Sequence, residues 1–267
     1  MAEQLPTFSV LNEALSTEDL SWLKSACQAH LNREDPIPSY VLLDHLESPV
    51  CQKIQKLIEA RIGQPIHYLN DFYFYSDNAF GAHWHVDTEL FTFEECLNAW
   101  MLLSPDEIEA PLAFIPSVND DPQNLFHTVK EVGEDYVFSN LSNMKKKVAP
   151  LKQIEDERVY TPRVKKGDIL VINPKRFHRT NTTVPKHAIV IKFVVKGAKG
   201  YLSEAQVPKM FWKEIGIFND LVKGSDQWDD VLSGLRQQLQ TPQGRKALSA
   251  GFFPEKIDLY RKMVQAL

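Results

Sequence analysis

Eight consecutive residues, AHWHVDTE at 82–89, carry two histidines and two carboxylates at alternate positions. These four residues are His83, His85, Asp87 and Glu89. If the segment is a strand, all four side chains emerge on one face, because successive side chains of a strand point to opposite faces. Imidazole nitrogens and carboxylate oxygens gathered on one face are good ligands for a divalent metal. The octet therefore predicts a metal site.

A third ligand must come from elsewhere in the chain, and His178 is the candidate. It lies just beyond a predicted strand at 169–173, which the turn at 166–168 introduces. His85, Asp87 and His178 together form a 2-His-1-carboxylate set. Such a set occupies one face of an octahedral iron and leaves three positions open for a bidentate cosubstrate and dioxygen.

The elements that must position these residues are predicted to be mostly strands. Several short segments are rich in β-branched and aromatic residues and are separated by turns, with no regular helix between them. This pattern is typical of an antiparallel sandwich or barrel rather than a parallel sheet. The predicted strands are 66–75, 82–87, 99–103, 112–115, 158–164, 169–173 and 187–195.

Helices are expected on both sides of the strands. One begins at Ser16, and a second begins at Ser48 and ends at Gly63, as their capping residues indicate. After residue 200 the pattern is helical, with a break predicted at 241–244. The helices predicted in this part are 210–222, 228–239 and 254–267. The expected layout is one domain over 1–267, with a helical flank (1–64), a β core (65–196) interrupted by an insertion (117–157), and a helical tail (197–267).

The sequence resembles the Fe(II)/2-oxoglutarate-dependent oxygenase superfamily, most closely its phytanoyl-CoA-hydroxylase-like branch. The matching pieces, in order, are HVD (85–87), GDILVI (167–172), HRTN (178–181) and KHAIVIKF (186–193). The likeness covers roughly residues 65–196. It implies a mainly β core with helical flanks, folded as a double-stranded β-helix (a cupin-like jelly roll). It also implies that His85, Asp87 and His178 bind Fe(II).

The resemblance further implies that 2-oxoglutarate chelates the iron and that a basic residue of the late strand meets its distal carboxylate. The matching residue is Lys186, where most of the branch carries Arg. Lys192, on the same face of that strand, is the second candidate, because an ammonium in a core strand needs an anionic partner. Tyr75 stands where several relatives place a tyrosine that touches the cosubstrate. Arg179, next to His178, is a further candidate for cosubstrate binding.

The implied activity is hydroxylation of an unactivated C–H bond in a small molecule, such as an amino acid or a specialised metabolite. 2-Oxoglutarate would be decarboxylated to succinate, and dioxygen would be consumed. Asp87 bears on the outcome, since relatives that halogenate replace this carboxylate with a small residue. Asn98 and Trp100, at alternate positions of the strand after the octet, are candidates to line the pocket.

Two alternatives stay open. The spacing of His83, His85 and Glu89 resembles the first metal motif of cupins, and with His178 this set would bind a metal without using 2-oxoglutarate. Asp87 would then have no role. Against this alternative, the glycine that cupins carry after the glutamate is missing here. The other alternative is a non-catalytic metabolite-binding barrel, which would require a weakened iron site.

The overall composition excludes several other functions. The net charge is –5 over 267 residues, so no basic surface is expected that would bind nucleic acid. The three cysteines form no CxxC pair, which favours a reducing compartment. The longest apolar segment is too short to span a bilayer, and the N-terminus lacks a signal-peptide pattern. We expect a cytoplasmic enzyme with a small-molecule substrate and no membrane partner; its oligomeric state is not indicated.

Overall fold

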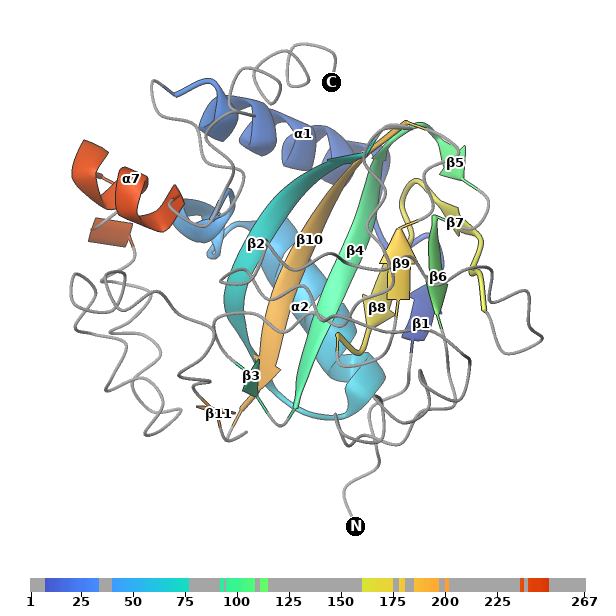
Figure 1. The fold of residues 1–267 in the computed structure, drawn as a ribbon. Coiled ribbons are helices and arrows are strands. Elements are labelled where there is room, and N and C mark those ends of the chain that lie inside the picture. The colour runs from blue at the N-terminus through green and yellow to red at the C-terminus, as the bar shows by residue number, and fades with distance from the viewer. Residues whose placement is uncertain are drawn as a thin grey trace, which may run out of the picture.

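The structure of the protein is a computed structural model that describes its sheets and the helices packed on them (Figure 1). The described residues are 8–33, 40–76, 92–93, 95–108, 111–114, 160–174, 178–180, 185–196, 200–201, 236–237 and 240–249.

A five-stranded sheet forms the centre of the molecule (Figure 1). Its neighbouring strands are all antiparallel. Their sequences are rich in Val, Ile, Leu, Phe and Tyr, which suit a pleated surface buried on both faces. The spatial order is β1 (Phe8–Leu11), β8 (Ile169–Ile172), β4 (Cys96–Ser104), β10 (Lys186–Val195) and β2 (Ile66–Ser76).

Among the described residues, three two-stranded antiparallel sheets accompany the main sheet. One of them, β6 with β9, packs on one face of the main sheet, because Leu112 and Phe114 share a hydrophobic cluster with Leu170 and Ile172. Two antiparallel sheets packed face to face are the arrangement of a jelly roll, so the predicted fold class is confirmed. The pairs are β6 (Leu112–Phe114) with β9 (His178–Thr180), β5 (Glu107–Ile108) with β7 (Val164–Lys165), and β3 (Thr92–Phe93) with β11 (Gly200–Tyr201).

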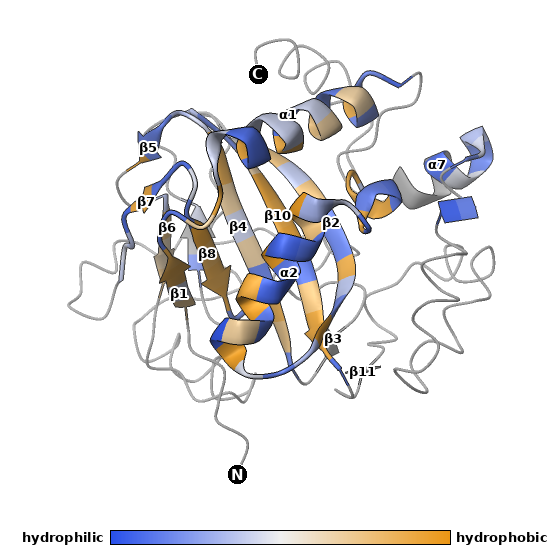
Figure 2. Ribbon diagram, turned by 180° about the vertical axis from the view of Figure 1, so that it is seen from behind, coloured by the Kyte–Doolittle hydropathy of each residue, from blue (hydrophilic) through white to orange (hydrophobic). Residues whose placement is uncertain are grey.

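Two helices cover the other face of the main sheet, and Figure 2 shows α2 lying across it. The helix α1 (Thr17–Leu31) begins with a capping box between Ser16 and Asp19. The helix α2 (Pro49–Ile62) is capped by Ser48 and ends at Gly63, whose φ of 70° is left-handed. Both helices begin where the sequence predicts.

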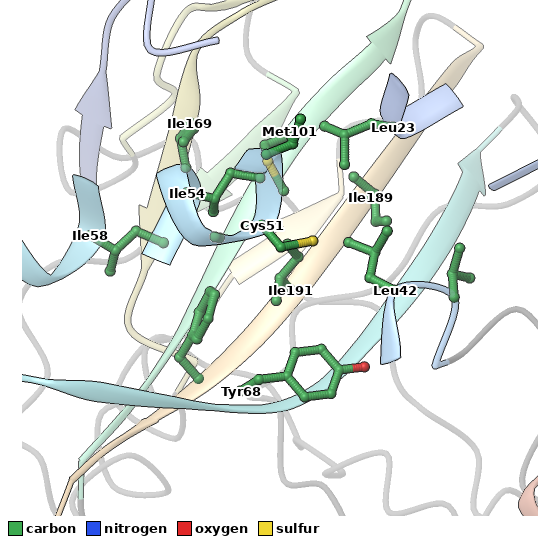
Figure 3. Close-up of a cluster of buried hydrophobic side chains, with 14 of the residues drawn as sticks. Leu23, Leu42, Cys51, Ile54, Ile58, Tyr68, Met101, Ile169, Ile189 and Ile191 are labelled. Carbon is green, nitrogen blue, oxygen red and sulfur yellow. The ribbon is translucent and has the colours of Figure 1, made fainter. Parts of the chain in front are cut away.

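The largest hydrophobic core lies between these helices and the sheet (Figure 3). Leu23 of α1 and Ile54 of α2 are fully buried against strand residues such as Ile189 of β10. A 3-10 helix, Leu43–His45, borders this core. The backbone N–H groups of Val41 and Leu42 donate to the two carboxylate oxygens of Asp71, at 2.7 and 2.8 Å.

The Gly-Asp pair before β8 has a clear structural reason. Gly167 has a φ of 98°, and a Cβ atom there would lie 2.9 Å from the carbonyl oxygen of Leu15. The carboxylate of Asp168 accepts hydrogen bonds from the backbone N–H groups of Glu13 and Lys165, each at 2.8 Å. The pair therefore joins the turn before β8 to the segment that leads into α1.

Parts of the structure differ from the sequence prediction. Over 160–163 only Tyr160 pairs, through a single bridge to Phe114, and strand β7 follows at 164–165, so the long strand predicted at 158–164 was wrong there. The break predicted at 241–244 is present only at Thr241, which is not helical, and was wrong for 242–244. The helix α7 (Pro242–Ser249) begins there, because the Thr241 hydroxyl accepts from the Gly244 N–H at 3.0 Å.

Several predicted segments lie outside the described residues. These are the strand at 82–87, the insertion at 117–157, the helices at 210–222 and 254–267, and most of the helix at 228–239. The single-domain layout therefore stays a prediction. Among the described residues, no helix has both the length and the hydropathy needed to cross a membrane.

Candidate active site

The candidate site lies on the face of the main sheet that the helices do not cover, which we call the inner face. A second hydrophobic cluster, separate from the helix-covered core, lies on this face. It includes Trp100 and Leu102 of β4, Leu170 of β8, and Ala188 of β10. Because side chains alternate along a strand, the intervening residues, such as Met101, belong to the helix-covered core instead. The sheet therefore separates a packing face from the inner face.

His178 is buried and lies on the side of β9 that faces the inner face. It is the register partner of Phe114, and the two rings lie 6.1 Å apart between centroids. Phe114 is fully buried in the cluster of the inner face, so its partner His178 points the same way. His178 itself is 5% exposed. The strand therefore holds this predicted metal ligand inside the barrel.

Lys186, the first residue of β10, is fully buried. It pairs with Ser76, and by strand alternation it belongs to the same face as Ala188. Burial lowers the pKa of this lysine to about 8. At neutral pH its ammonium is still mostly charged, so the inner face carries a buried cation at this end of β10.

Lys192 is the second buried lysine of the inner face, at 8% exposure. It pairs with Asn70 of β2 and with Asn98 of β4. It lies six residues after Lys186 on the same strand, which corresponds to about 20 Å along the strand axis. One small carboxylate cannot bridge that separation, so the two predicted candidates cannot anchor the same group together.

The register also places the other predicted residues. Tyr75 pairs with His187 rather than with Lys186, so its position belongs to the alternate set of β2 residues, and on β2 the register favours Phe74 for the inner face. Arg179 pairs with Ala113, one position away from His178. The side chains of Tyr75 and Arg179 lie outside the described part of the chain, so their contact with a cosubstrate stays a prediction.

His187 was predicted to point away from Lys186, and it does. Its Nδ1 atom lies 2.6 Å from the hydroxyl oxygen of Tyr73, a residue of the helix-covered core. Burial, aided by the charge of Lys24, lowers the pKa of His187 to about 4. This imidazole is therefore neutral at physiological pH and holds β10 against β2.

His83, His85, Asp87 and Glu89 all lie outside the described residues. Within the described ranges, no three histidine, cysteine or acidic side chains gather into a group that could hold a metal ion. The three-residue site, and the choice between Asp87 and Glu89, therefore stay predictions.

Comparison with known proteins bears on both the family and the fold. Residues 7–185 match the phytanoyl-CoA dioxygenase (PhyH) family. A search of curated proteins found no match.

Three solved structures share the fold at low sequence identity. The non-heme alpha-ketoglutarate-dependent epimerase SnoN from nogalamycin biosynthesis is 13% identical, with a TM-score of 0.51 over 76% of this chain and 83% of that chain. The alpha-ketoglutarate-dependent carbocyclase SnoK, also from nogalamycin biosynthesis, is 13% identical. Its TM-score is 0.50, over 73% of this chain and 81% of that chain. EvdO2 from Micromonospora carbonacea var. aurantiaca, in a complex with 2-oxoglutarate, is 13% identical. Its TM-score is 0.50, over 76% of this chain and 91% of that chain.

Proposed function

Because this chain belongs to the phytanoyl-CoA dioxygenase family, we propose that it is an Fe(II)- and 2-oxoglutarate-dependent dioxygenase that hydroxylates a small molecule. The observation that carries the proposal is the placement of His178 and Lys186 on the inner face. Both are buried on separate strands of a jelly roll, where an imidazole suits iron and an ammonium suits a carboxylate.

The residues present fit the metal that the family implies. His178 presents an imidazole from β9 into the barrel, and His85 and Asp87 would complete the 2-His-1-carboxylate set. Phe114, whose ring lies 6.1 Å from that of His178, restricts the orientation of the imidazole. When bound, iron with 2-oxoglutarate and dioxygen supplies the oxidising power for the reaction, and 2-oxoglutarate is decarboxylated to succinate.

Lys186 is the residue that we assign to the distal carboxylate of 2-oxoglutarate. It occupies the position of the basic residue in the matching motif, and its complete burial strengthens an ion pair with a bound anion. Leu102 and Ala188, both fully buried on the inner face, surround the anion with apolar surface and exclude water from the site. Lys192, the second candidate, lies too far along β10 to share this carboxylate.

Hydroxylation is the outcome that we favour among the reactions of this fold. The epimerase SnoN and the carbocyclase SnoK have the same fold, so the fold alone does not select a reaction. Asp87 supplies a carboxylate where halogenating relatives carry a small residue, and halogen transfer is therefore not expected. The substrate is proposed to be a small molecule, as nogalamycin RO is in the complex with SnoN.

The test begins without oxygen. The protein is mixed with Fe(II) and 2-oxoglutarate, and the visible charge-transfer absorption of the chelate is recorded. Oxygen is then admitted and succinate is measured. We expect the absorption band and succinate formation in the wild type, and loss of both in His178→Ala and Asp87→Ala. The far-UV circular dichroism of each variant serves as the control for folding.

The same experiment separates the alternatives. A cupin-type site would lose metal in Glu89→Ala, would keep it in Asp87→Ala, and would show no band with 2-oxoglutarate. A non-catalytic barrel would show the band but form no succinate with any candidate substrate. Either result would contradict the proposed function.

A further inference from the structure

A row of polar residues crosses the inner face at the C-terminal half of β10. Lys192 lies between Asn70 of β2 and Asn98 of β4 as their direct register partner. Lys192 is 8% exposed and Asn98 is 3% exposed. Two positions earlier, Val190 pairs with Trp100, so the row adjoins apolar surface. The sheet thus presents a buried ammonium group flanked by two neutral amides.

The sheet register connects this row with the strand that carries His178. Asn98 pairs with Ile172 of β8, and Ile172 pairs with Phe8 of β1. The Phe8 ring stacks on that of Phe114, with centroids 5.1 Å apart and planes inclined by 24°. Phe114 is in turn the register partner of His178. Register partners and one ring contact therefore connect the polar row with His178 across the inner face.

Lys186 lies at the opposite end of β10, as the first residue of that strand. The six residues that separate it from Lys192 correspond to about 20 Å along β10. Bound 2-oxoglutarate would lie between the metal at His178 and the ammonium of Lys186. The face around Lys192 and Asn98 is then left for the molecule that is to be oxidised.

We propose that Lys192 and Asn98 bind an anionic group of the primary substrate, a carboxylate or a phosphate. This inference rests on the proposed function, which places the metal at His178 and the cosubstrate carboxylate at Lys186. The ammonium of Lys192 supplies a positive charge, and the amide of Asn98 supplies N–H donors that an anionic oxygen accepts. Both residues lie on long, paired strands, which fix their positions more rigidly than a loop would.

The chemistry of the row favours an anion over other ligands. The register neighbours of Lys192 are amides, which carry no charge and can accept hydrogen bonds from an ammonium. A cationic substrate would be repelled by this charge in a buried, weakly screened position. The adjoining Val190 and Trp100 would contact the apolar part of the same molecule.

The test uses matched probes on the anaerobic complex of protein, Fe(II) and 2-oxoglutarate. Hexanoate is compared with hexanamide, and hexyl phosphate with 1-hexanol, by calorimetric titration. In the wild type, at least one anionic probe should bind about tenfold or more tightly than its neutral partner. Lys192→Met should reduce this preference below about threefold, while Lys192→Arg should retain it. The two pairs distinguish a carboxylate site from a phosphate site.

Two further variants complete the design. Asn98→Ala should weaken binding of the preferred anion by a smaller factor, about twofold, because the charge remains but the N–H donors are lost. Lys196→Met serves as the matched control, because Lys196 is an exposed lysine just after β10, and it should change neither affinity. In all variants the Kd of 2-oxoglutarate should stay within about twofold of the wild type.

Each contrary result has a distinct meaning. If neither anionic probe binds more tightly than its neutral partner in the wild type, the inference is overturned. If Lys192→Met raises the Kd of 2-oxoglutarate about tenfold and Lys186→Met does not, Lys192 anchors the cosubstrate and the inference is again overturned. The proposed function survives both results. Its own failure would show as the absence of 2-oxoglutarate binding in the wild type.

Discussion

At the scale of single residues, Lys186 carries the most specific consequence. Burial lowers the pKa of its ammonium group to about 8, so deprotonation begins close to neutral pH. A neutral amine cannot form an ion pair with the distal carboxylate of 2-oxoglutarate. We therefore expect the affinity for 2-oxoglutarate to fall about tenfold from pH 7 to pH 9, as the charged fraction falls. Calorimetric titration of the metal-loaded protein would measure this dependence.

Lys186→Arg is the matched control for that prediction. A guanidinium group stays protonated throughout this pH range, so the variant should bind 2-oxoglutarate with little change between pH 7 and pH 9. Lys186→Met should bind weakly at both pH values. Equal pH dependence in the wild type and in Lys186→Arg would show that another group controls the affinity.

His187 leads to a second prediction at this scale, on stability. Its pKa is about 4 in the folded protein and near 6.5 when exposed, so on acidification the unfolded chain takes up the proton first. The stability that His187 contributes is present above pH 6.5 and is lost as the pH falls toward 4. We measure the free energy of unfolding of the wild type and of His187→Gln by urea unfolding. The excess of the wild-type value should shrink by up to about 1.4 kcal/mol for each pH unit in this window.

The comparison with His187→Gln is needed because Asp71 acts in the opposite direction. Burial raises the pKa of Asp71 to about 6, against the hydrogen bonds that it accepts from Leu42, Tyr68 and Val41. This carboxyl group favours the folded state at low pH and loses that contribution as the pH rises through about 6. The difference between the two proteins cancels the Asp71 contribution. A constant difference from pH 4 to pH 7 would contradict the assignment of His187 as a buried neutral base.

At the scale of elements, the turn between β7 and β8 is the clearest case of sequence dictating geometry. Gly167 combines a φ of 98° with a close approach to the Leu15 carbonyl oxygen, whereas Gly63 at the end of α2 has a φ of 70° and open space around its Cβ position. Gly63→Ala should cost about 1 kcal/mol, for the left-handed backbone alone. Gly167→Ala should cost about 2–4 kcal/mol, because a contact of 2.9 Å adds steric strain.

Urea unfolding of both variants measures the difference between the two glycines. The Kd of 2-oxoglutarate should be unchanged in Gly63→Ala, since this residue lies at the end of a helix on the far side of the main sheet. Equal losses of stability in the two variants would mean that the segment around Leu15 moves aside and that the turn does not tie it to β8.

At the scale of the whole molecule, local signals predicted the elements well where capping or alternation was strong. Ser16, Ser48 and Gly63 mark the helix boundaries, and the apolar runs mark the strands of the main sheet. The strand β1 was missed because four residues, FSVL, are too short to show a period, and its partner β8 follows far along the chain. The start of α7 was misread because Thr-Pro-Gln-Gly has the composition of a turn, although Thr241 caps a helix there.

The sequence predicts the residue types of the candidate site but not their spatial arrangement. The order of the motifs singled out His178 and Lys186, and strand alternation correctly placed Lys192 on the face of Lys186. Sequence spacing could not show that Asn70 and Asn98 flank Lys192, because register between distant strands depends on the pairing of the whole sheet. The connection between Lys192 and His178 follows from that register together with the contact between the rings of Phe8 and Phe114.

The division of the main sheet into two faces gives the last prediction. Ile189 is fully buried in the helix-covered core, one position from Ala188 on the inner face. Ile189→Ala should lower the free energy of unfolding by about 2–4 kcal/mol, through lost burial and a cavity between β10 and the helices. The Kd of 2-oxoglutarate should nevertheless stay within about twofold of the wild type under conditions where the variant is folded.

Lys186→Met should show the reverse, with weak cosubstrate binding and a smaller change in stability. If Ile189→Ala weakened binding as strongly as Lys186→Met, the helix-covered core would itself shape the site, and the two faces would not be independent.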